Sequence, residues 1–336
     1  MNSFQFGSKF IGGDNPVYII SEIGINHEGS INKCKELIEQ SKDAGADAVK
    51  LQTINPDLNY APDTESYKLF KQASLSNDDT AEIFKFAKEL KIDCFSTCGD
   101  FETLKFLREL NPAGWKISSG LLTHIPLIEE IISYDEPILF SSGMTGLREL
   151  EEVVSICKSN NKKSFGIFQC TSLYPAPFES LNLNCIKSLE KKFDCVIGFS
   201  DHSNGILAAS IAVSLGAKMI EKHFTYDSSR DGFDHKISLE HDQFKKMVLD
   251  IRNTELMLGS SEKNTEQTNE NSKKYLRKVA ALKKINKGEV FSTKNIGVLR
   301  VNQSFGEQPK EFNNILGKSA KNDLEPFTPI SNKDHL

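Results

Sequence analysis

The segment MIEKHF, Met219–Phe224, decides the fold because it is a strand whose two faces differ in chemistry. It follows a helical pattern and a Gly–Ala turn, and side chains alternate along a strand with period two. Met219, Glu221 and His223 therefore share one face, whereas Lys222 lies on the other. A buried carboxylate needs a partner or a metal, so the face that carries Glu221 is predicted to border a polar site. Lys222, on the outer face, is predicted to be the expendable residue of the three.

Seven further segments upstream are apolar and rich in β-forming residues, and helical patterns separate most of them. The eight predicted strands read YIISEIG, AVKLQT, DCFSTC, GWKISSG, PILFSSG, FGIFQCT, VIGFSD and MIEKHF. Strands that alternate with helices form a parallel sheet. Eight such units within about 240 residues predict an α/β fold with a closed (β/α)₈ barrel rather than an open doubly wound sheet.

Nearly every predicted strand ends in polar residues of the types that enzymes use. These strand-end residues are Glu22, Lys50, Gln52, Thr97, Lys116, Ser119, Ser141, Ser142, Thr171, Ser172, Ser200, Asp201, His202, Glu221 and His223. A structural explanation would need a separate reason for each strand. In (β/α)₈ barrels the active site lies at the C-terminal ends of the strands, so we predict an active site at this rim.

Two histidines are predicted to lie side by side at the rim. The strand before MIEKHF ends in FSDHS, which places His202 next to His223, with the Glu221 carboxylate nearby. Two imidazoles and a carboxylate on adjacent strand ends form a donor set for a divalent metal. On the residues alone, two structural histidines with satisfied hydrogen bonds remain an equal alternative.

The rim also carries the groups that bind anions. Ammonium groups supply charge, and hydroxyl and backbone N–H groups supply hydrogen bonds, which suits a ligand with phosphate and carboxylate groups. The residues concerned are Lys50, Gln52, Lys116, Ser119, Ser141 and Ser200. The sequence contains no P-loop, no G-x-G-x-x-G and no G-x-S-x-G, which disfavours nucleotide binding and serine hydrolysis.

The composition is that of a soluble globular protein, with 38% hydrophobic and 26% charged residues. The first residues contain no apolar run long enough for a signal peptide or a membrane helix. Seven cysteines lack metal-binding or redox spacing, so we expect reduced thiols, a cytoplasmic location and no membrane partner. Cys98 and Cys170 are interpreted as wall residues of the rim, because nothing beside them in sequence lowers a thiol pKa.

The chain is predicted to divide into a barrel domain (1–258), a polar linker (259–277) and a small C-terminal domain (278–336). The stretch GSSEKNTEQTNENSKK contains no apolar residue, which indicates a solvated connector. Residues 273–336 carry 13 Lys or Arg and 6 Asp or Glu, so the rest of the chain is strongly acidic. Nucleic acid is one explanation of this asymmetry, but docking of the two modules on each other is favoured.

The motifs resemble one enzyme family. SEIGINHEG, KLQT, STC, KISSG, SSGM, CTSLYPAP, GFSDHS and IEKHFT…DGFDHK follow the order found in N-acetylneuraminate (sialic acid) synthases, which include legionaminic and pseudaminic acid synthases. The tail KKINKGEVFSTKNIGVLRV resembles their C-terminal antifreeze-like (SAF) domain. The resemblance covers almost the whole chain. It implies an enzyme that condenses phosphoenolpyruvate with an N-acylated mannosamine-type sugar and releases phosphate and a nine-carbon 2-keto acid.

The resemblance also implies roles for single residues. His202 and His223 resemble the metal ligands, usually for Mn²⁺ or Mg²⁺, and the catalytic set is Glu22, Glu221 and Lys50. The groups that would hold phosphoenolpyruvate are Lys50, Thr97, Lys116, Ser119, Ser141 and Ser200. Further residues of the substrate region are Gln52, Ser172, Tyr174 and Asp234. Arg300 resembles the arginine that the SAF domain inserts into the partner subunit's barrel, which implies a domain-swapped homodimer.

Two positions depart from the family pattern. The chain has Ser119-Gly120-Leu121 where Ser-Gly-Glu is usual, and Arg300-Val301-Asn302 where Arg-Pro-Gly is usual. A leucine cannot hydrogen-bond a hydroxyl group, so we expect a sugar that is deoxygenated or acylated at the corresponding position. A synthase of a 6-phosphorylated sugar and a non-catalytic sugar-binding relative remain as alternatives.

Overall fold

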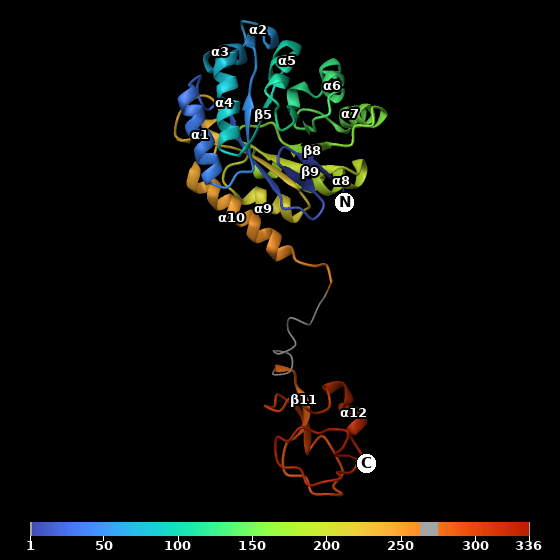
Figure 1. Cartoon of the computed structure of the whole chain (residues 1–336). Coiled ribbons are helices and arrows are strands. Elements are labelled where there is room, and N and C mark those ends of the chain that lie inside the picture. The colour runs from blue at the N-terminus through green and yellow to red at the C-terminus, as the bar shows by residue number, and fades with distance from the viewer. Residues whose placement is uncertain (1, 263–274, 336) are drawn as a thin grey trace. The chain divides into compact units, whose positions relative to one another are not determined.

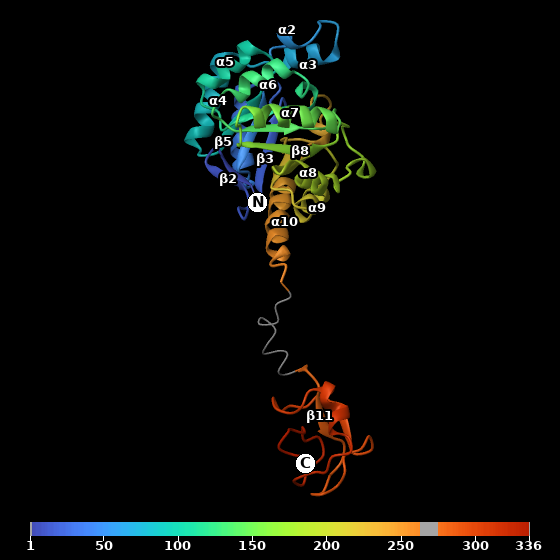
Figure 2. The same cartoon turned by 90° about the vertical axis from the view of Figure 1, so that its right-hand side faces the viewer.

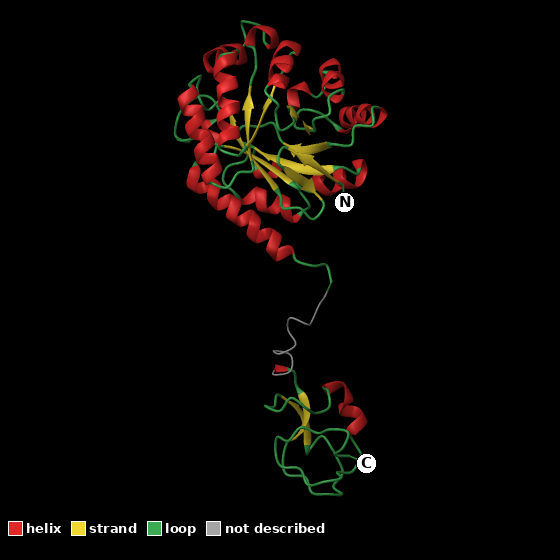
Figure 3. Cartoon of the chain, viewed as in Figure 1, coloured by secondary structure: helices red, strands yellow, loops and turns green. Residues whose placement is uncertain are grey.

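The computed structural model describes residues 2–262 and 275–335, and the chain divides into two compact units after Gly259. In the first unit, parallel strands close into a barrel in the order β10-β3-β4-β5-β6-β7-β8-β9 (Figure 3). The strands are β3 (Tyr18–Gly24), β4 (Ala48–Gln52), β5 (Asp93–Thr97), β6 (Trp115–Ile117), β7 (Ile138–Ser141), β8 (Phe165–Cys170), β9 (Val196–Asp201) and β10 (Met219–His223). The predicted (β/α)₈ barrel and its eight strands are thus confirmed.

Helices surround the barrel, as Figures 1 and 2 show from two sides. They are α1 (Ile31–Asp43), α2 (Pro56–Asn59), α3 (Glu65–Ala73), α4 (Asn77–Glu89), α5 (Phe101–Glu109), α6 (Ile125–Ile132), α7 (Leu147–Ser159), α8 (Cys185–Phe193), α9 (Leu207–Ser214) and α10 (His241–Leu258). Short 3₁₀ turns are η1 (Ser119–Leu121), η2 (Phe178–Ser180) and η3 (His235–Ile237). Several helices begin at a polar cap; the Ser30 hydroxyl, for example, accepts from the Lys33 N–H at the start of α1.

The register of the barrel brings the predicted rim residues together. Glu22 on β3 lies opposite Lys50 on β4 and His223 on β10. One strand further, Gln52 lies opposite Thr97, which in turn lies opposite Lys116. Below them, apolar inward-facing side chains such as Ile20 and Met219 fill the barrel, so the polar layer has a packed apolar floor.

An N-terminal hairpin, which the sequence analysis missed, lies at the opposite end of the barrel. It consists of β1 (Ser3–Phe6) and β2 (Lys9–Gly12). The ring of Phe6 packs edge-on against Tyr18 and Phe95 of the barrel, with ring centroids 5.6 and 5.0 Å apart. Because these partners face into the barrel, the hairpin extends the apolar interior and covers its N-terminal end.

Two aspartates fasten this hairpin to the barrel. Asp93 accepts hydrogen bonds from the Ser8 N–H at 3.0 Å and from the Tyr18 hydroxyl at 2.7 Å. Asp47 accepts from the Ile19 N–H at 2.7 Å and pairs with Lys9 of β2. Every oxygen of these two carboxylates therefore has a partner within the protein.

Lys222 lies on the outer face of β10, as predicted, but this face is not exposed to solvent. In a barrel the outer face of a strand lies under the helices, and Lys222 is fully buried there. Its ammonium group donates to Asp201 Oδ2 at 3.0 Å and to the Ser203 carbonyl, while the Ser203 N–H donates to Asp201 Oδ1 at 2.8 Å. Removal of Lys222 would leave a buried carboxylate without its countercharge, so this residue is part of the structure.

The second unit has a core of its own. Strands β11 (Lys278–Ala281) and β12 (Ile296–Leu299) pair antiparallel, followed by η5 (Pro309–Glu311) and α12 (Phe312–Ile315). Its buried residues include Val279, Phe291, Ile296, Ile315 and Ile330. Of the predicted linker, residues 263–274 lie outside the described residues. None of the helices described in either unit is long and apolar enough to cross a membrane.

Candidate active site

The C-terminal ends of the strands surround a cavity of about 1460 Å³ that opens to solvent. Predicted site residues that line this cavity are Glu22, Lys50, Gln52, Thr97, Lys116, Ser119, Ser141, Tyr174, Ser200, His202, Glu221, His223 and Asp234. Ser172 lies beside the cavity, with its hydroxyl close to Gly143. Arg300 belongs to the second unit, where its guanidinium stacks on the Tyr275 ring at 5.0 Å.

Two buried lysines and two buried glutamates form the floor of the cavity. Lys116 Nζ donates to Glu221 Oε1 and Oε2 at 2.9 and 2.8 Å. Lys50 Nζ lies 2.9 Å from Glu22 Oε2 and 3.8 Å from Glu221 Oε2. The Ser200 hydroxyl donates to Glu221 at 2.9 Å. Glu221 therefore contacts the lysines, whereas the sequence had suggested that it supports the two histidines.

The surroundings of the two glutamates push their pKa values apart. Burial raises the pKa of Glu22, and the charge of Glu221 adds to this, although Lys50 opposes it. Burial would also raise the pKa of Glu221, but Lys116 and Lys50 hold it at about 2. Glu221 thus remains ionised near neutral pH, and Glu22 is the carboxyl group suited to exchange a proton.

Several polar atoms of the site have no hydrogen-bond partner. Among the described residues, Thr97 Oγ1, Ser172 Oγ and His223 Nδ1 are buried and unpaired, and all three lie at or beside the cavity. Buried polar atoms are normally paired, and orphans of this kind mark a strained or ligand-binding position. The other unpaired atoms of the described residues are Glu22 Oε2, which has the Lys50 ammonium group 2.9 Å away, and Trp115 Nε1 and Glu136 Oε2, which lie where β6 and β7 begin. Most of the unpaired atoms thus lie at or beside the cavity, where a bound ligand would complete their hydrogen bonding.

The two predicted metal-binding histidines are neighbours, with ring centroids 5.4 Å apart. His202 Nδ1 donates to the Thr171 carbonyl at 2.8 Å, which leaves Nε2 for a ligand. His223 Nδ1 lies 3.6 Å from Asp234 Oδ2. Burial and the charges of His202 and Lys50 lower the pKa of His223 well below its ordinary value, so its imidazole is neutral, as a metal ligand must be.

These residues fit a divalent cation as an open donor set. Two imidazoles and one carboxylate, from His202, His223 and Asp234, resemble a 2-His-1-carboxylate arrangement with free positions. In the part of the chain that the structure describes, no group of three or more His, Cys, Asp or Glu side chains is spaced so that it could hold a metal ion, so these three residues would have to move closer together to do so. Substrate oxygens or water would have to supply the other ligands.

Cys98 and Cys170 differ from each other, contrary to the shared interpretation of the sequence. Burial raises the pKa of Cys98 to about 12, as expected of an inert wall residue. Burial has the same tendency at Cys170, but His202, whose Nδ1 lies 3.8 Å from Sγ, lowers the pKa of this thiol. Cys170 and His202 are 32 positions apart in the chain, so no local sequence signal reveals their contact.

One wall of the cavity comes from residues that the sequence analysis did not single out. The long connection after β4 carries α2 and α3 and contributes Asn59, Tyr60, Ser66, Leu69 and Phe70. Met144, after β7, lines the cavity together with Leu121. The connection from β4 to α4 is unusually long and contains two helices, and this length is the feature of the sequence that could have predicted a loop covering the rim.

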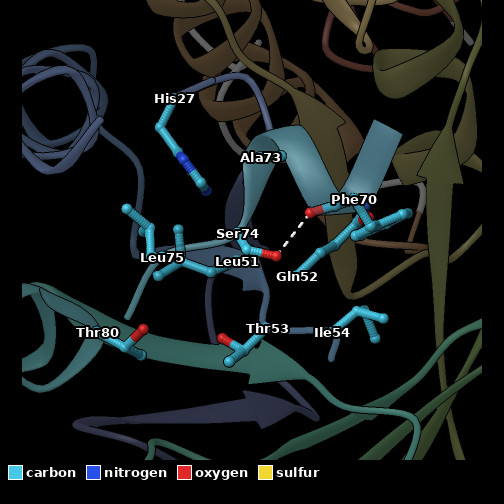
Figure 4. Close-up of a pocket in the computed structure, with 10 residues that line it drawn as sticks. All are labelled: His27, Leu51, Gln52, Thr53, Ile54, Phe70, Ala73, Ser74, Leu75 and Thr80. Carbon is cyan, nitrogen blue, oxygen red and sulfur yellow. Dashed lines mark hydrogen bonds between the residues drawn. The ribbon is translucent and has the colours of Figure 1, made fainter. Parts of the chain in front are cut away.

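Figure 4 shows a smaller pocket of about 370 Å³ beside this wall. Gln52, Ile54 and Phe70 border both spaces, so the pocket is a side chamber of the larger cavity. His27 reaches into it, and burial lowers its pKa to about 4, so the ring is neutral. The residues that line the side chamber include no lysine and no carboxylate, and the reactive groups therefore belong to the larger cavity.

The fold and the polar strand ends together define a (β/α)₈-barrel enzyme with its site at the usual end of the barrel. The chain belongs to the NeuB family, whose model matches residues 37–263, and a SAF domain model matches residues 277–334. The antifreeze-like C-terminal domain and the resemblance to sialic acid synthases are thus confirmed.

Known relatives and a solved structure extend this result. The chain is 36% identical to a pseudaminic acid synthase of Campylobacter jejuni, over 93% of this chain and 94% of that protein. It is 33% identical to an N,N'-diacetyllegionaminic acid synthase of Legionella pneumophila, over 96% of each. An N-acetylneuraminic acid synthetase from Leptospira borgpetersenii superposes with a TM-score of 0.77 at 31% identity, over 82% of this chain and 97% of that one. The protein is therefore a sugar-acid synthase of the N-acetylneuraminate synthase type.

Proposed function

We propose that this enzyme condenses phosphoenolpyruvate with an N-acetylmannosamine-type sugar, in a reaction that depends on a divalent metal. The products are a sialic-acid-like nonulosonic acid and phosphate. The observation that carries the proposal is the layer of two buried lysines beneath an unpaired, neutral His223. Cations for an anionic substrate and a donor for a metal lie within one cavity.

Phosphoenolpyruvate binds, in this proposal, on the floor of the cavity. Lys50 and Lys116 are buried, and each already has a carboxylate at about one hydrogen-bond length. Burial lowers the pKa of Lys116, whereas Glu22 and Glu221 outweigh burial at Lys50 and raise its pKa. The ammonium groups supply the positive charge that an incoming anion requires. Ser119, Ser141 and Ser200 line the same cavity and supply hydroxyl groups to the phosphate. The Thr97 hydroxyl, which has no partner, donates to the carboxylate.

The bond-forming steps require one acid–base group. Carbon 3 of phosphoenolpyruvate attacks the open-chain aldehyde of the sugar, the aldehyde oxygen becomes an alkoxide, and carbon 2 becomes oxocarbenium-like. Water adds to carbon 2, and one of its protons passes to the alkoxide, which becomes a hydroxyl group. The tetrahedral intermediate then expels phosphate by C–O cleavage, and the second proton leaves with the phosphate as carbon 2 becomes a ketone. Glu22 takes the proton from water, because burial raises its pKa and makes it a stronger base than Glu221, whose pKa the lysines lower. Glu221 remains an anion and keeps Lys116 in place.

The aldehyde end of the sugar lies at the two histidines. His202, His223 and Asp234 would hold Mn²⁺ or Mg²⁺, and polarisation of the aldehyde as a Lewis acid is the chemistry such an ion supplies. Tyr174 stacks on the His202 ring, with centroids 4.3 Å apart, and so covers this end of the site. The ring shields the aldehyde from bulk water.

The far wall of the cavity favours a particular acceptor. Leu121 and Met144 line it, and neither can hydrogen-bond a hydroxyl group. An acceptor that lacks a hydroxyl there, such as a 2,4-diacetamido-trideoxy sugar, is therefore a second candidate, and the relatives named as pseudaminic and legionaminic acid synthases agree with it. The described lining residues include no arginine and no lysine other than the two assigned to phosphoenolpyruvate, so no further cation is present for a 6-phosphate group on the sugar.

We also propose that the enzyme is a domain-swapped homodimer in which Arg300 of the SAF domain serves the barrel of the partner. Residues 273–336 are basic and the rest of the chain is acidic, which supports contact between the modules of two chains. Mixing Arg300→Ala subunits with His223→Ala subunits tests the idea. Recovery of activity in the mixture is expected, and a mixture as inactive as its parts would refute the swap.

The reaction is tested by phosphate release from phosphoenolpyruvate with Mn²⁺ and a panel of sugars. The panel contains N-acetylmannosamine, its 6-phosphate and a 2,4-diacetamido-trideoxy sugar. Release with at least one sugar, abolished by chelation and by His223→Ala, is expected. Absence of phosphate with every sugar would overturn the proposed reaction, and full activity of His223→Ala would overturn its assignment as a metal ligand.

A further inference from the structure

A cluster of five polar residues outside the cavity joins two rim loops. We define the Glu28 cluster as Glu28, Lys33, Tyr226, Arg230 and His235. The Glu28 carboxylate accepts from Lys33 Nζ at 2.6 Å, Tyr226 Oη at 2.6 Å and His235 Nε2 at 3.1 Å, and it forms an ion pair with Arg230 Nη2 at 2.8 Å. Glu28 belongs to the loop between β3 and α1, whereas three of its partners belong to the loop between β10 and α10. One carboxylate thus fastens two loops that are about 200 residues apart in sequence.

The backbone of Glu28 has a strained conformation, which indicates that the contacts of its side chain hold it there. Its φ is 54°, in the left-handed region that non-glycine residues disfavour by about 1–2 kcal/mol. The four donors compensate for this strain. Burial would raise the pKa of Glu28, but the hydrogen bonds from Lys33 and Tyr226 hold it at about 2, so the carboxylate is ionised.

A second contact between the same loops lies next to a residue of the cavity. The Asp234 N–H donates to Asn26 Oδ1 at 3.0 Å. Asn26 Nδ2 donates in turn to the Phe224 carbonyl and the Ser238 hydroxyl, each at 2.9 Å. Asn26 and the Glu28 cluster therefore bracket Asp234, since His235 follows it directly in the chain.

The position of Asp234 depends on these loop contacts more than the position of His223 does. His223 belongs to β10 and is fixed by the barrel, whereas Asp234 lies in the 225–240 loop, outside any strand. Among the described residues, no side chain or backbone group hydrogen-bonds the Asp234 carboxylate, which approaches His223 Nδ1 at 3.6 Å. The loop must therefore be held from behind if Asp234 is to face His223 in a constant geometry.

We propose that Glu28 is a positioning residue for Asp234. Its carboxylate fastens the 225–240 loop to the loop after β3 through Tyr226, Arg230 and His235, and this holds Asp234 against His223. Glu28 touches neither substrate nor metal. The inference rests on the proposed function only in that Asp234 contributes to the metal and sugar end of the site.

The test compares Glu28→Gln with a matched control, Asp43→Asn. The Asp43 carboxylate accepts from His241 Nε2 at 2.8 Å and from Lys245 Nζ at 3.1 Å, so it has the same kinds of partner but lies on the surface between α1 and α10. Hydrogen–deuterium exchange is measured first, on metal-free protein. We expect faster exchange across residues 225–240 in Glu28→Gln and wild-type exchange there in Asp43→Asn. Equal exchange of this loop in Glu28→Gln and wild type would overturn the proposal.

The second measurement compares the effect of Glu28→Gln on Mn²⁺ affinity with its effect on the KM for phosphoenolpyruvate. Titration calorimetry with Mn²⁺ is expected to give a dissociation constant about 10-fold higher for Glu28→Gln, with the KM for phosphoenolpyruvate within twofold of wild type. The double variant Glu28→Gln/Asp234→Asn is expected to bind Mn²⁺ no more weakly than Asp234→Asn alone. Additive losses in the double variant, or a shift of both ligands alike, would show a role other than positioning of Asp234.

The two hypotheses fail in different ways. If wild-type enzyme released no phosphate with any sugar, the proposed reaction would fall, while exchange in the 225–240 loop would still decide the role of Glu28. If phosphate release were normal but Glu28→Gln left loop exchange and Mn²⁺ affinity unchanged, only the positioning role would fall.

Discussion

The aspartates at the N-terminal end of the barrel and two polar residues at its C-terminal end differ in how their atoms are paired. At the N-terminal end, Asp47 and Asp93 fasten the hairpin, and each of their carboxylate oxygens has a donor from the protein. At the C-terminal end, Thr97 and His223 are buried and present unpaired atoms. Since an unpaired buried group destabilises a fold, the two aspartates stabilise the structure, whereas Thr97 and His223 lie where a ligand would supply the missing partners.

The largest effect is expected at the C-terminal end, for Glu22→Gln. The amide cannot accept the proton from water, so kcat should fall by about 10²- to 10⁴-fold. The melting temperature should fall slightly, because Lys50 loses the carboxylate 2.9 Å away and keeps only Glu221 at 3.8 Å. Steady-state kinetics and a thermal melt check both. A variant that kept its kcat and lost only stability would place Glu22 with the structural groups of the other end.

Lys222→Met probes the wall between the two ends. The variant keeps the packing of the side chain but leaves Asp201 buried without its countercharge, so the free energy of unfolding should fall by about 3–5 kcal/mol. Chemical denaturation measures the loss. The double variant Lys222→Met/Asp201→Asn is the control and should recover part of it. Wild-type stability in Lys222→Met would restore the expectation that this lysine is expendable.

Asp93→Ala probes the N-terminal end. The Ser8 N–H and the Tyr18 hydroxyl would lose their acceptor, and the free energy of unfolding should fall by about 2–4 kcal/mol. The kcat for phosphate release should stay within about twofold, because the hairpin lies far from the cavity along the strands. A large loss of kcat in folded protein would break the separation between the two ends.

The smallest effect is a pH dependence at Glu28. Its pKa is about 2 in the folded protein against an ordinary value of 4.5, because donors favour the ionised form. The unfolded chain therefore binds the extra proton between these values, and the stabilisation is complete above pH 4.5 and lost as the pH falls through 2. The gap in melting temperature between wild type and Glu28→Gln should narrow below pH 4.5. A gap that widened in acid would contradict the sign.

The sequence predicted those parts of the site that depend on strand periodicity. Alternation along β10 places Glu221 and His223 inside, and the parallel register brings Glu22 next to Lys50. It failed where burial depends on what covers a strand, as at Lys222, which helices enclose. It also failed where partners are distant in sequence, as for Cys170 with His202 and for the Glu28 cluster, since no local pattern encodes such contacts.

The N-terminal hairpin was missed for a related reason. Its two four-residue strands are too short to show a strong alternation, and its role depends on rings such as Phe95 that come much later in the chain. The wall formed by α2 and α3 was missed because its residues are ordinary ones, such as Leu69 and Phe70. Only their place above the rim gives them a role.

The covered end of the barrel has a consequence for the traffic of molecules. With the hairpin across one end, both reactants arrive and both products depart through the same opening. Glu221, which pairs with Lys116, lies one pleat deeper on β10 than His223. If the anionic substrate binds at the lysines and the sugar at the histidines, as proposed above, the anion has to enter before the sugar. A site with a single opening of this kind imposes ordered binding, because the substrate that binds deeper has to enter first.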